Sequence, residues 1–78
     1  MVVLKNHSNV SEGTGCRTYT SISLVEFFGE YVVIEYQRIL FRDGWQDEQR
    51  NTTVHDDSGS CYEHAEGVYN ELVEAYKD

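Results

Sequence analysis

The side chains best suited to hold a metal ion lie in one short segment of the sequence. His55, Cys61 and His64 supply nitrogen and sulfur donors, and Asp57 lies between the first two. These residue types suit zinc. Five residues separate His55 from Cys61 and two separate Cys61 from His64, a spacing that matches no common zinc motif. We therefore expect loop and helix-cap residues at these positions, and predict neither a metal nor another cofactor.

The other residues with catalytic potential are poorly placed for it. Ser58, His55 and Asp56 are too close in the sequence to form a catalytic triad from separate elements. The Gly13-Thr14-Gly15 segment lacks the lysine and the strand–helix setting of a phosphate-binding loop. Carboxylates are numerous, but no apolar surroundings separate the pKa values of a pair. We expect a protein that is not an enzyme.

The composition restricts the class of protein further. A chain of 78 residues makes one small domain, and an apolar content of 40% excludes a disordered one. No apolar run is long enough to cross a membrane, and the first residues do not resemble a secretory signal. Six Lys and Arg against 14 Asp and Glu give a net charge of −8, which argues against direct binding to nucleic acid or to an anionic membrane.

The two cysteines, Cys16 and Cys61, lie far apart in the sequence. Small folds that depend on disulfides usually contain more cysteine and follow a signal sequence. We therefore expect reduced thiols and a cytoplasmic protein. A disulfide that closes the long loop between the two residues is the alternative.

The middle of the chain carries the strongest strand signal. β-branched and aromatic residues dominate segments 18–28 and 31–42, and Gly29-Glu30 between them fits a tight hairpin turn. Asp43-Gly44 predicts a second hairpin. The return strand, 45–54, is polar and therefore belongs at an edge of the sheet.

The rest of the chain divides into a short strand, two loops and one helix. The predicted strand covers residues 2–4, and the loops cover 6–15 and 55–60. Ser60 and Glu63 fit a capping box that opens a helix over residues 61–77. Its apolar arc comprises Cys61, Tyr62, Ala65, Val68, Tyr69, Leu72, Ala75 and Tyr76. The order predicts an α+β fold, an antiparallel meander of three to four strands with one C-terminal amphipathic helix packed on one face.

Alternation along the strands assigns residues to two sheet faces. A two-residue turn at Gly29-Glu30 places Val25 opposite Ile34, and we expect the helix on the face of these two residues, with Phe27, Val32 and Tyr36. The other face then stays uncovered and is the predicted dimer or partner face, with Ile22, Leu24, Phe28, Tyr31, Val33, Ile39 and Phe41. A register shifted by one residue would exchange the two faces, but one apolar face would still be left uncovered.

Negative charge is concentrated in the C-terminal half of the chain. Residues 1–42 sum to zero, so residues 43–78 carry the whole −8. Four glutamates fall on the outer face of the predicted helix, over roughly 16 Å of its axis. The predicted partner-binding acids are Asp47, Glu48, Asp56, Asp57, Glu63, Glu66, Glu71 and Glu74. A row of this kind predicts binding to the basic nucleic-acid channel of another protein, with solubility as the alternative explanation.

These features together resemble a group of phage proteins. The chain is short and acidic, with a predicted hairpin set over residues 18–54 and an acidic helix over residues 60–77. In this profile it is similar to the small acidic anti-defence proteins of bacteriophages, the anti-CRISPR proteins in particular. The resemblance implies a stoichiometric inhibitor in the host cytoplasm that blocks the DNA-binding surface of a surveillance complex. Other phage targets, such as a restriction enzyme or RNA polymerase, stay open.

Two functional hypotheses follow. In the first, the protein inhibits a basic nucleic-acid-binding complex of the host by mimicking DNA. In the second, it is a homodimeric structural or small-ligand-binding module that uses its second apolar sheet face. Binding that weakens steeply with salt would favour the first hypothesis.

Overall fold

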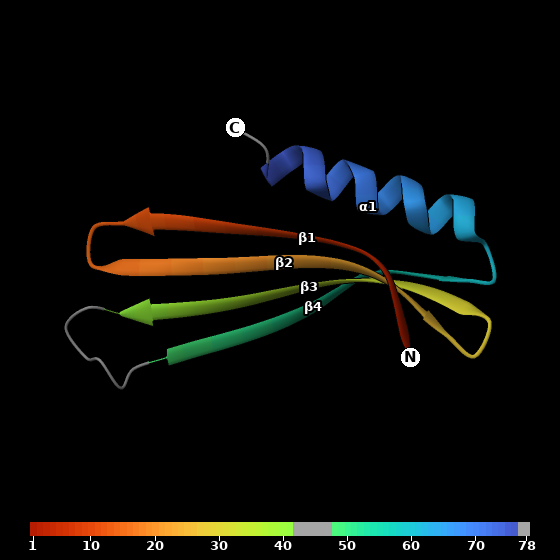
Figure 1. Ribbon diagram of the computed structural model, residues 1–78, viewed down its shortest axis with the longest axis horizontal. Coiled ribbons are helices and arrows are strands. Elements are labelled where there is room, and N and C mark those ends of the chain that lie inside the picture. Colours follow the sequence, from red (N-terminus) through yellow and green to blue (C-terminus); the bar gives the residue numbers. More distant parts are fainter. Residues whose placement is uncertain (42–47, 77–78) are drawn as a thin grey trace.

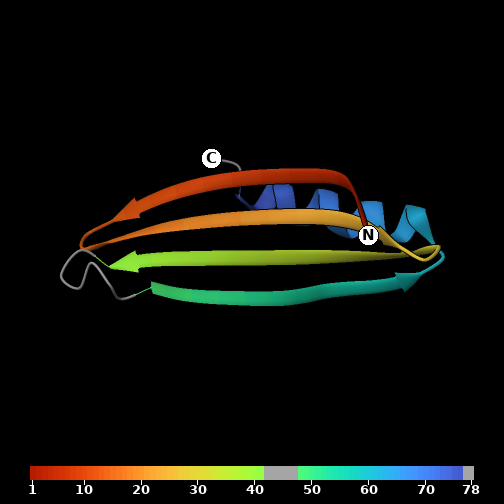
Figure 2. The same ribbon diagram turned by 60° about the horizontal axis from the view of Figure 1, so that its bottom comes forward.

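The computed structural model describes residues 1–41 and 48–76. Its strands are β1 (Val2–Gly13), β2 (Cys16–Phe27), β3 (Glu30–Phe41) and β4 (Glu48–Gly59), followed by one helix, α1 (Tyr62–Tyr76). Each strand pairs antiparallel with the next one, in the order β1-β2-β3-β4, and α1 lies along one face of this open sheet (Figures 1 and 2). The predicted α+β meander with one C-terminal helix is confirmed.

Both edge strands are longer than expected from their polar sequences. β1 runs through the segment 6–15 that we expected to be a loop, and β4 continues past residue 54 to Gly59. In β1 the side-chain amide of Asn6 donates to Ser21 Oγ at 2.8 Å and to Ser23 Oγ at 2.9 Å. Polar residues are tolerated in these strands because each has one solvent-exposed edge, and backbone pairing with an apolar neighbour supplies the order.

The turn between β2 and β3 lies one residue earlier than predicted. Phe28 has a φ of 52° and Gly29 a φ of 82°, the pair of positive values that a type I′ hairpin turn requires. Val25 consequently pairs with Val32, and not with Ile34. This change of two residues in the pairing leaves the division of residues between the two faces intact.

The second predicted hairpin turn, Asp43-Gly44, lies outside the described residues. Next to it, Leu40 pairs with Glu48, whereas a two-residue turn would have paired Leu40 with Asp47. The strand partners on this side are therefore offset by one residue from the prediction, which exchanges the faces expected for the side chains of β4.

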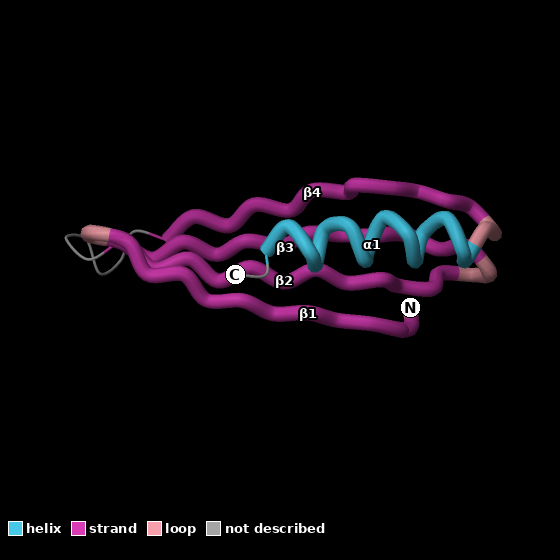
Figure 3. Tube along the Cα trace, turned by 90° about the horizontal axis from the view of Figure 1, so that it is seen from above, coloured by secondary structure: helices cyan, strands magenta, loops and turns pink. Residues whose placement is uncertain are grey.

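The helix covers the face that we expected to be open, and this prediction was wrong. Ile22, Leu24 and Val33 are fully buried beneath Ala65 and Tyr69 of α1. Figure 3 shows α1 running along β2 and β3 on this side. The predicted partner face is therefore largely the protein core.

The choice of face is made where the chain leaves β4. Gly59 has a φ of 59°, a left-handed conformation that glycine adopts without steric cost. The amide of Cys61 then donates to the carbonyl of Ser58 at 3.1 Å. Strand alternation separates two sets of side chains but does not say which set the following helix covers, and this turn decides it.

α1 is too short to cover the whole sheet. A helix of 15 residues extends about 22 Å at 1.5 Å per residue, while a strand of 12 residues extends about 40 Å. At the covered end Tyr31 meets Tyr62, with ring centroids 5.3 Å apart. Ile39 and Phe41, two further members of the predicted partner face, are only half-buried at the opposite end of β3.

The helix begins at Tyr62, one residue later than predicted, and the amide of Ala65 donates to the carbonyl of Cys61 at 3.3 Å. Cys61, rather than Ser60, therefore precedes the first helical residue. Cys61 and Ala75, two members of the predicted apolar arc, are exposed. The residues that pack around Ala65 and Tyr69 are Tyr62, Val68, Leu72, Val73 and Tyr76.

Candidate functional site

The outer side of α1 presents the exposed acids of the predicted row. Glu63, Glu71 and Glu74 are exposed, and α1 has no basic residue in its last turn. A carboxylate in the last turn of a helix is opposed by the helix dipole, so the dipole does not account for Glu74. This side of α1 is the part of the predicted acidic surface that the structure keeps available.

Glu66, another acid of the predicted row, is paired inside the molecule. Lys5 Nζ lies 2.9 Å from Glu66 Oε2, and the hydroxyl of Tyr62 donates to the same oxygen at 2.7 Å. The Lys5 ammonium, followed by the Tyr62 hydroxyl, lowers the pKa of Glu66 from its ordinary value. Glu66 thus ties α1 to β1 and presents little uncompensated charge to a partner.

The remaining predicted acids are dispersed and mostly compensated. Glu48 lies between Arg50, at 3.1 Å, and Arg38, and hydrogen bonds from Arg50 and then Arg38 lower the pKa of Glu48. Asp56 accepts from Ser58 and lies 3.3 Å from His64. Glu48, Asp56 and Asp57 do not join the helical row, and the predicted Asp47 lies outside the described residues.

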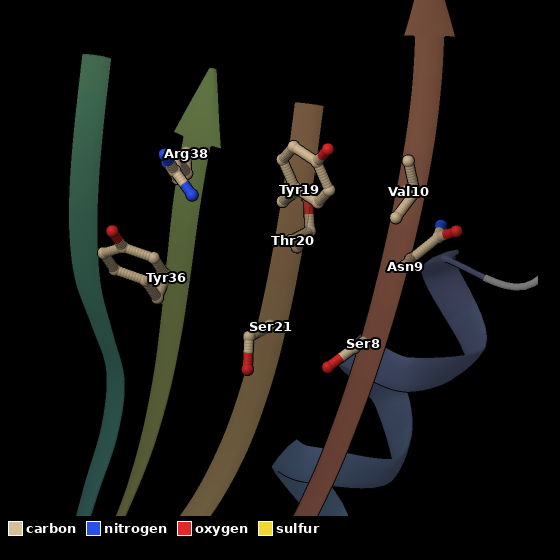
Figure 4. Close-up of a pocket in the computed structure, with 8 residues that line it drawn as sticks. All are labelled: Ser8, Asn9, Val10, Tyr19, Thr20, Ser21, Tyr36 and Arg38. Atoms are coloured by element: carbon tan, nitrogen blue, oxygen red, sulfur yellow. The ribbon is translucent and has the colours of Figure 1, made fainter. Parts of the chain in front are cut away.

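The sheet face opposite α1, here called the open face, carries Val25, Phe27, Val32, Ile34 and Tyr36. Its apolar side chains continue onto both edge strands, where Val3 is 54% exposed and Val54 is 59% exposed. Figure 4 shows Tyr19, Tyr36 and Arg38 on this face, around a hollow of about 270 Å³. The surplus apolar surface that the sequence predicts therefore exists, on the face opposite to the expected one.

Charge is divided unequally between the two sides of the sheet. Over the described residues the open face has a net charge of −1 and the helix side −6, from the strand pairing and the sequence. The open face carries Arg17, Arg38 and Arg50 against Glu12, Glu30, Glu48 and Asp57. The helix side carries Lys5 against Glu26, Glu35, Asp56, Glu63, Glu66, Glu71 and Glu74. In the part of the chain that the structure describes, the helix side is therefore strongly acidic and the open face is nearly neutral.

The sequence did not predict a hydrogen-bonded cluster beneath α1, which is formed by the carboxylate of Glu35 with His55 and Tyr76. Glu35 of β3 is 9% exposed, its Oε1 lies 2.6 Å from His55 Nε2, and its Oε2 accepts a hydrogen bond from the hydroxyl of Tyr76. Burial raises the pKa of Glu35, but hydrogen bonds from Tyr76 and His55 outweigh burial and lower it. The signal in the sequence is a single acid on the core-facing side of an apolar strand.

The candidate metal ligands are separated by these contacts. His55 bonds Glu35 and His64 lies beside Asp56, while Cys61 is exposed. Within residues 1–41 and 48–76, no three histidine, cysteine or acidic side chains are arranged to hold a metal ion. Cys16 begins β2 at one end of the sheet and Cys61 precedes α1 at the other, and both are free thiols.

Comparison with protein families, with curated proteins and with solved structures gave no match. None of the helical residues that the structure describes forms a segment long and apolar enough to span a membrane. The function must therefore be inferred from the charge, exposure and packing of the residues described above.

Proposed function

We propose that the protein is a non-catalytic inhibitor that binds a nucleic-acid-binding defence complex in the bacterial cytoplasm. In this proposal the acidic outer side of α1 occupies a basic channel that otherwise holds DNA, and the profile-level resemblance to anti-CRISPR proteins supplies the class of target. The observation that carries the proposal is the charge separation, −6 on the helix side against −1 on the open face among the described residues.

The spacing of the exposed acids supports this role. From Glu63 to Glu71 the axis of α1 rises about 12 Å, and double-stranded DNA presents one phosphate per ~3.4 Å along each strand. The two carboxylates are thus separated along the axis by a distance between about three and four phosphate steps of one strand. Opposite charges of this kind steer association and favour one partner over others, which is what an inhibitor competing with DNA requires.

Three compensated acids contribute little to the proposed contact. Glu48, Asp56 and Glu66 already face Arg50, His64 and Lys5 respectively. A basic partner would have to displace Arg50, His64 or Lys5 to use these acids. The proposed contact therefore involves fewer acids than the sequence predicts, and it is centred on Glu63 and Glu71.

The test is inhibition of DNA binding by purified, guide-loaded CRISPR effector complexes of several types. We expect the unmodified protein to inhibit at least one of them, with a potency that falls steeply as salt rises. Replacing Glu63 and Glu71 by Lys should weaken inhibition by about tenfold or more, with little change in stability. Glu12 and Glu26 replaced by Lys make the matched control, because the net charge changes equally and neither residue is in α1.

The two variants separate mimicry from a general effect of net charge. Loss of inhibition in the helix variant alone supports the proposal. Equal inhibition by the helix variant and the unmodified protein would refute a role for the acidic helix and leave solubility as its explanation. If no effector complex loses DNA binding, the proposed target class is wrong.

A further inference from the structure

We infer that the open face pairs with the same face of a second copy of this chain, in a two-fold stack that leaves both helices outside. The two sheets would then form a second apolar layer, in addition to the one beneath α1. This inference concerns assembly and does not depend on the proposed inhibition.

The apolar part of the open face is too extensive to be incidental. Phe27 is 44% exposed and Val54 is 59% exposed, and they border Val32 and Ile34, which are half-buried. The whole face, polar residues included, measures about 40 by 19 Å, from the length and spacing of four strands. Its footprint, roughly 760 Å² by the same estimate, is similar in size to the ~800 Å² that each partner buries in a standard stable interface.

Charges on the open face are arranged with opposite signs at its two ends. The end that holds the Phe28-Gly29 turn carries Glu30 and Asp57. Among the described residues, the other end carries Arg17, Arg38 and Arg50 with Glu12 and Glu48, a net charge of +1 against −2. A two-fold axis that lies between the two stacked faces, perpendicular to the strands, would place each basic end over the acidic end of the partner. The face is therefore complementary to itself.

Most polar side chains in the middle of the open face already have partners. Asn6 donates to Ser21 and Ser23, and the hydroxyl of Ser8 donates to Asn6 Oδ1 at 3.2 Å. Covering groups that are hydrogen-bonded to each other costs much less than covering unpaired ones. These hydrogen-bonded side chains consequently do not oppose burial under a second sheet.

The overall charge favours this geometry over other ways of pairing two copies. A net charge of −8 repels a second copy, and the repulsion is strongest between the helix sides, which hold most of the described acids. Stacking the nearly neutral open faces keeps the helices on opposite outer surfaces. Two-fold association through one shared patch is the commonest form of protein oligomer.

Sedimentation equilibrium of the whole chain tests the inference. We expect a mass of twice the 9.0 kDa of one chain at millimolar concentration. Replacing Phe27 and Val54 by Asp should return the protein to one chain. The matched control replaces Val2 and Ala75 by Asp, because both are exposed, apolar and off the open face, and it should still form dimers.

A reciprocal charge exchange tests the orientation without touching apolar residues. Arg50→Glu should weaken self-association by about tenfold, and adding Glu30→Arg to the same chain should restore it, because the two-fold axis brings these ends together. A single-chain mass for the unmodified protein at millimolar concentration overturns the inference. So does equal dissociation of the Asp variant and its control, or a dimer that neither the Asp variant nor Arg50→Glu disturbs.

Discussion

Glu35 Oε1 lies 2.6 Å from His55 Nε2, and this contact joins the centre of β3 to β4 beneath the helix. The other oxygen of the same carboxylate accepts a hydrogen bond from Tyr76, the last residue of α1. One buried acid therefore connects two strands and the end of the helix. The first two predictions concern this cluster.

Replacing Tyr76 by Phe should lower the free energy of unfolding by about 1.5–3 kcal/mol, because the lost hydrogen bond is to a charged, buried acceptor. Urea denaturation measures the change. Tyr62→Phe is the matched control, since the Tyr62 hydroxyl donates to the more exposed Glu66, and it should cost clearly less than Tyr76→Phe. Equal losses of stability in the two variants would contradict the claim that a hydrogen bond to the buried Glu35 stabilises the fold more than one to the more exposed Glu66.

The stability of the protein should fall in acid partly through Glu35. The pKa of Glu35 is lower in the folded protein than its ordinary value, so its contribution is complete above the unfolded pKa of about 4.3. The contribution is lost as the pH falls through the lower, folded value. Glu35→Gln should therefore unfold with a shallower dependence on pH between neutral and strongly acidic solution.

The comparison for this pH effect is Glu63→Gln, because Glu63 is an exposed acid of α1. We expect the pH dependence of Glu35→Gln to be shallower than that of Glu63→Gln, because Glu35 is buried and accepts two hydrogen bonds. If Glu35→Gln and the unmodified protein lose stability in parallel on acidification, then hydrogen bonds to the ionised Glu35 do not stabilise the fold.

Phe28→Asn should raise the free energy of unfolding by about 1 kcal/mol, because Phe28 has a φ of 52° and a left-handed backbone costs roughly 1–2 kcal/mol outside glycine and asparagine. The side chain of Phe28 is 95% exposed, so little burial is lost. Phe28→Ala removes the ring but keeps the strain, and thermal unfolding should show no gain for it. A gain of similar size in Phe28→Ala would show that removal of the ring, and not relief of strain, is responsible.

Gly67→Ala should stabilise the protein by about 0.5–1 kcal/mol, because Gly67 lies within α1 and an added Cβ meets nothing within 4 Å. Gly59→Ala also meets open space, but Gly59 has a φ of 59°, so the same added methyl group should destabilise. Chemical denaturation of both variants measures whether each substitution raises or lowers the free energy of unfolding. A stabilised Gly59→Ala would contradict the turn geometry that directs the chain into α1.

Local side-chain patterns were sufficient to predict the two central strands, the helix and the fold class. β2, β3 and α1 each carry an apolar periodicity of their own, which signals their existence without reference to the rest of the chain. β1 and the second half of β4 lack such a pattern, because their order comes from backbone pairing with a neighbour. Sequence propensity does not report pairing of that kind.

The candidate site was only partly predictable for a related reason. The helical acids followed from residue spacing, but the neutralisation of Glu66 depends on Lys5, which is close only in the folded sheet. The face beneath α1 was predicted wrongly because it depends on the backbone at Gly59 rather than on strand alternation. Glu35 was overlooked because its partners, His55 and Tyr76, come from two other elements.

The position of α1 after all four strands has a consequence for synthesis on the ribosome. The helix follows all four strands, yet it covers Ile22, Leu24 and Val33, which are made much earlier. Until α1 emerges, a nascent sheet of β1 to β4 would expose apolar side chains on both of its faces, and such intermediates are prone to aggregate. The same logic makes a truncated product that ends before Tyr62 a natural substrate for chaperones and proteases.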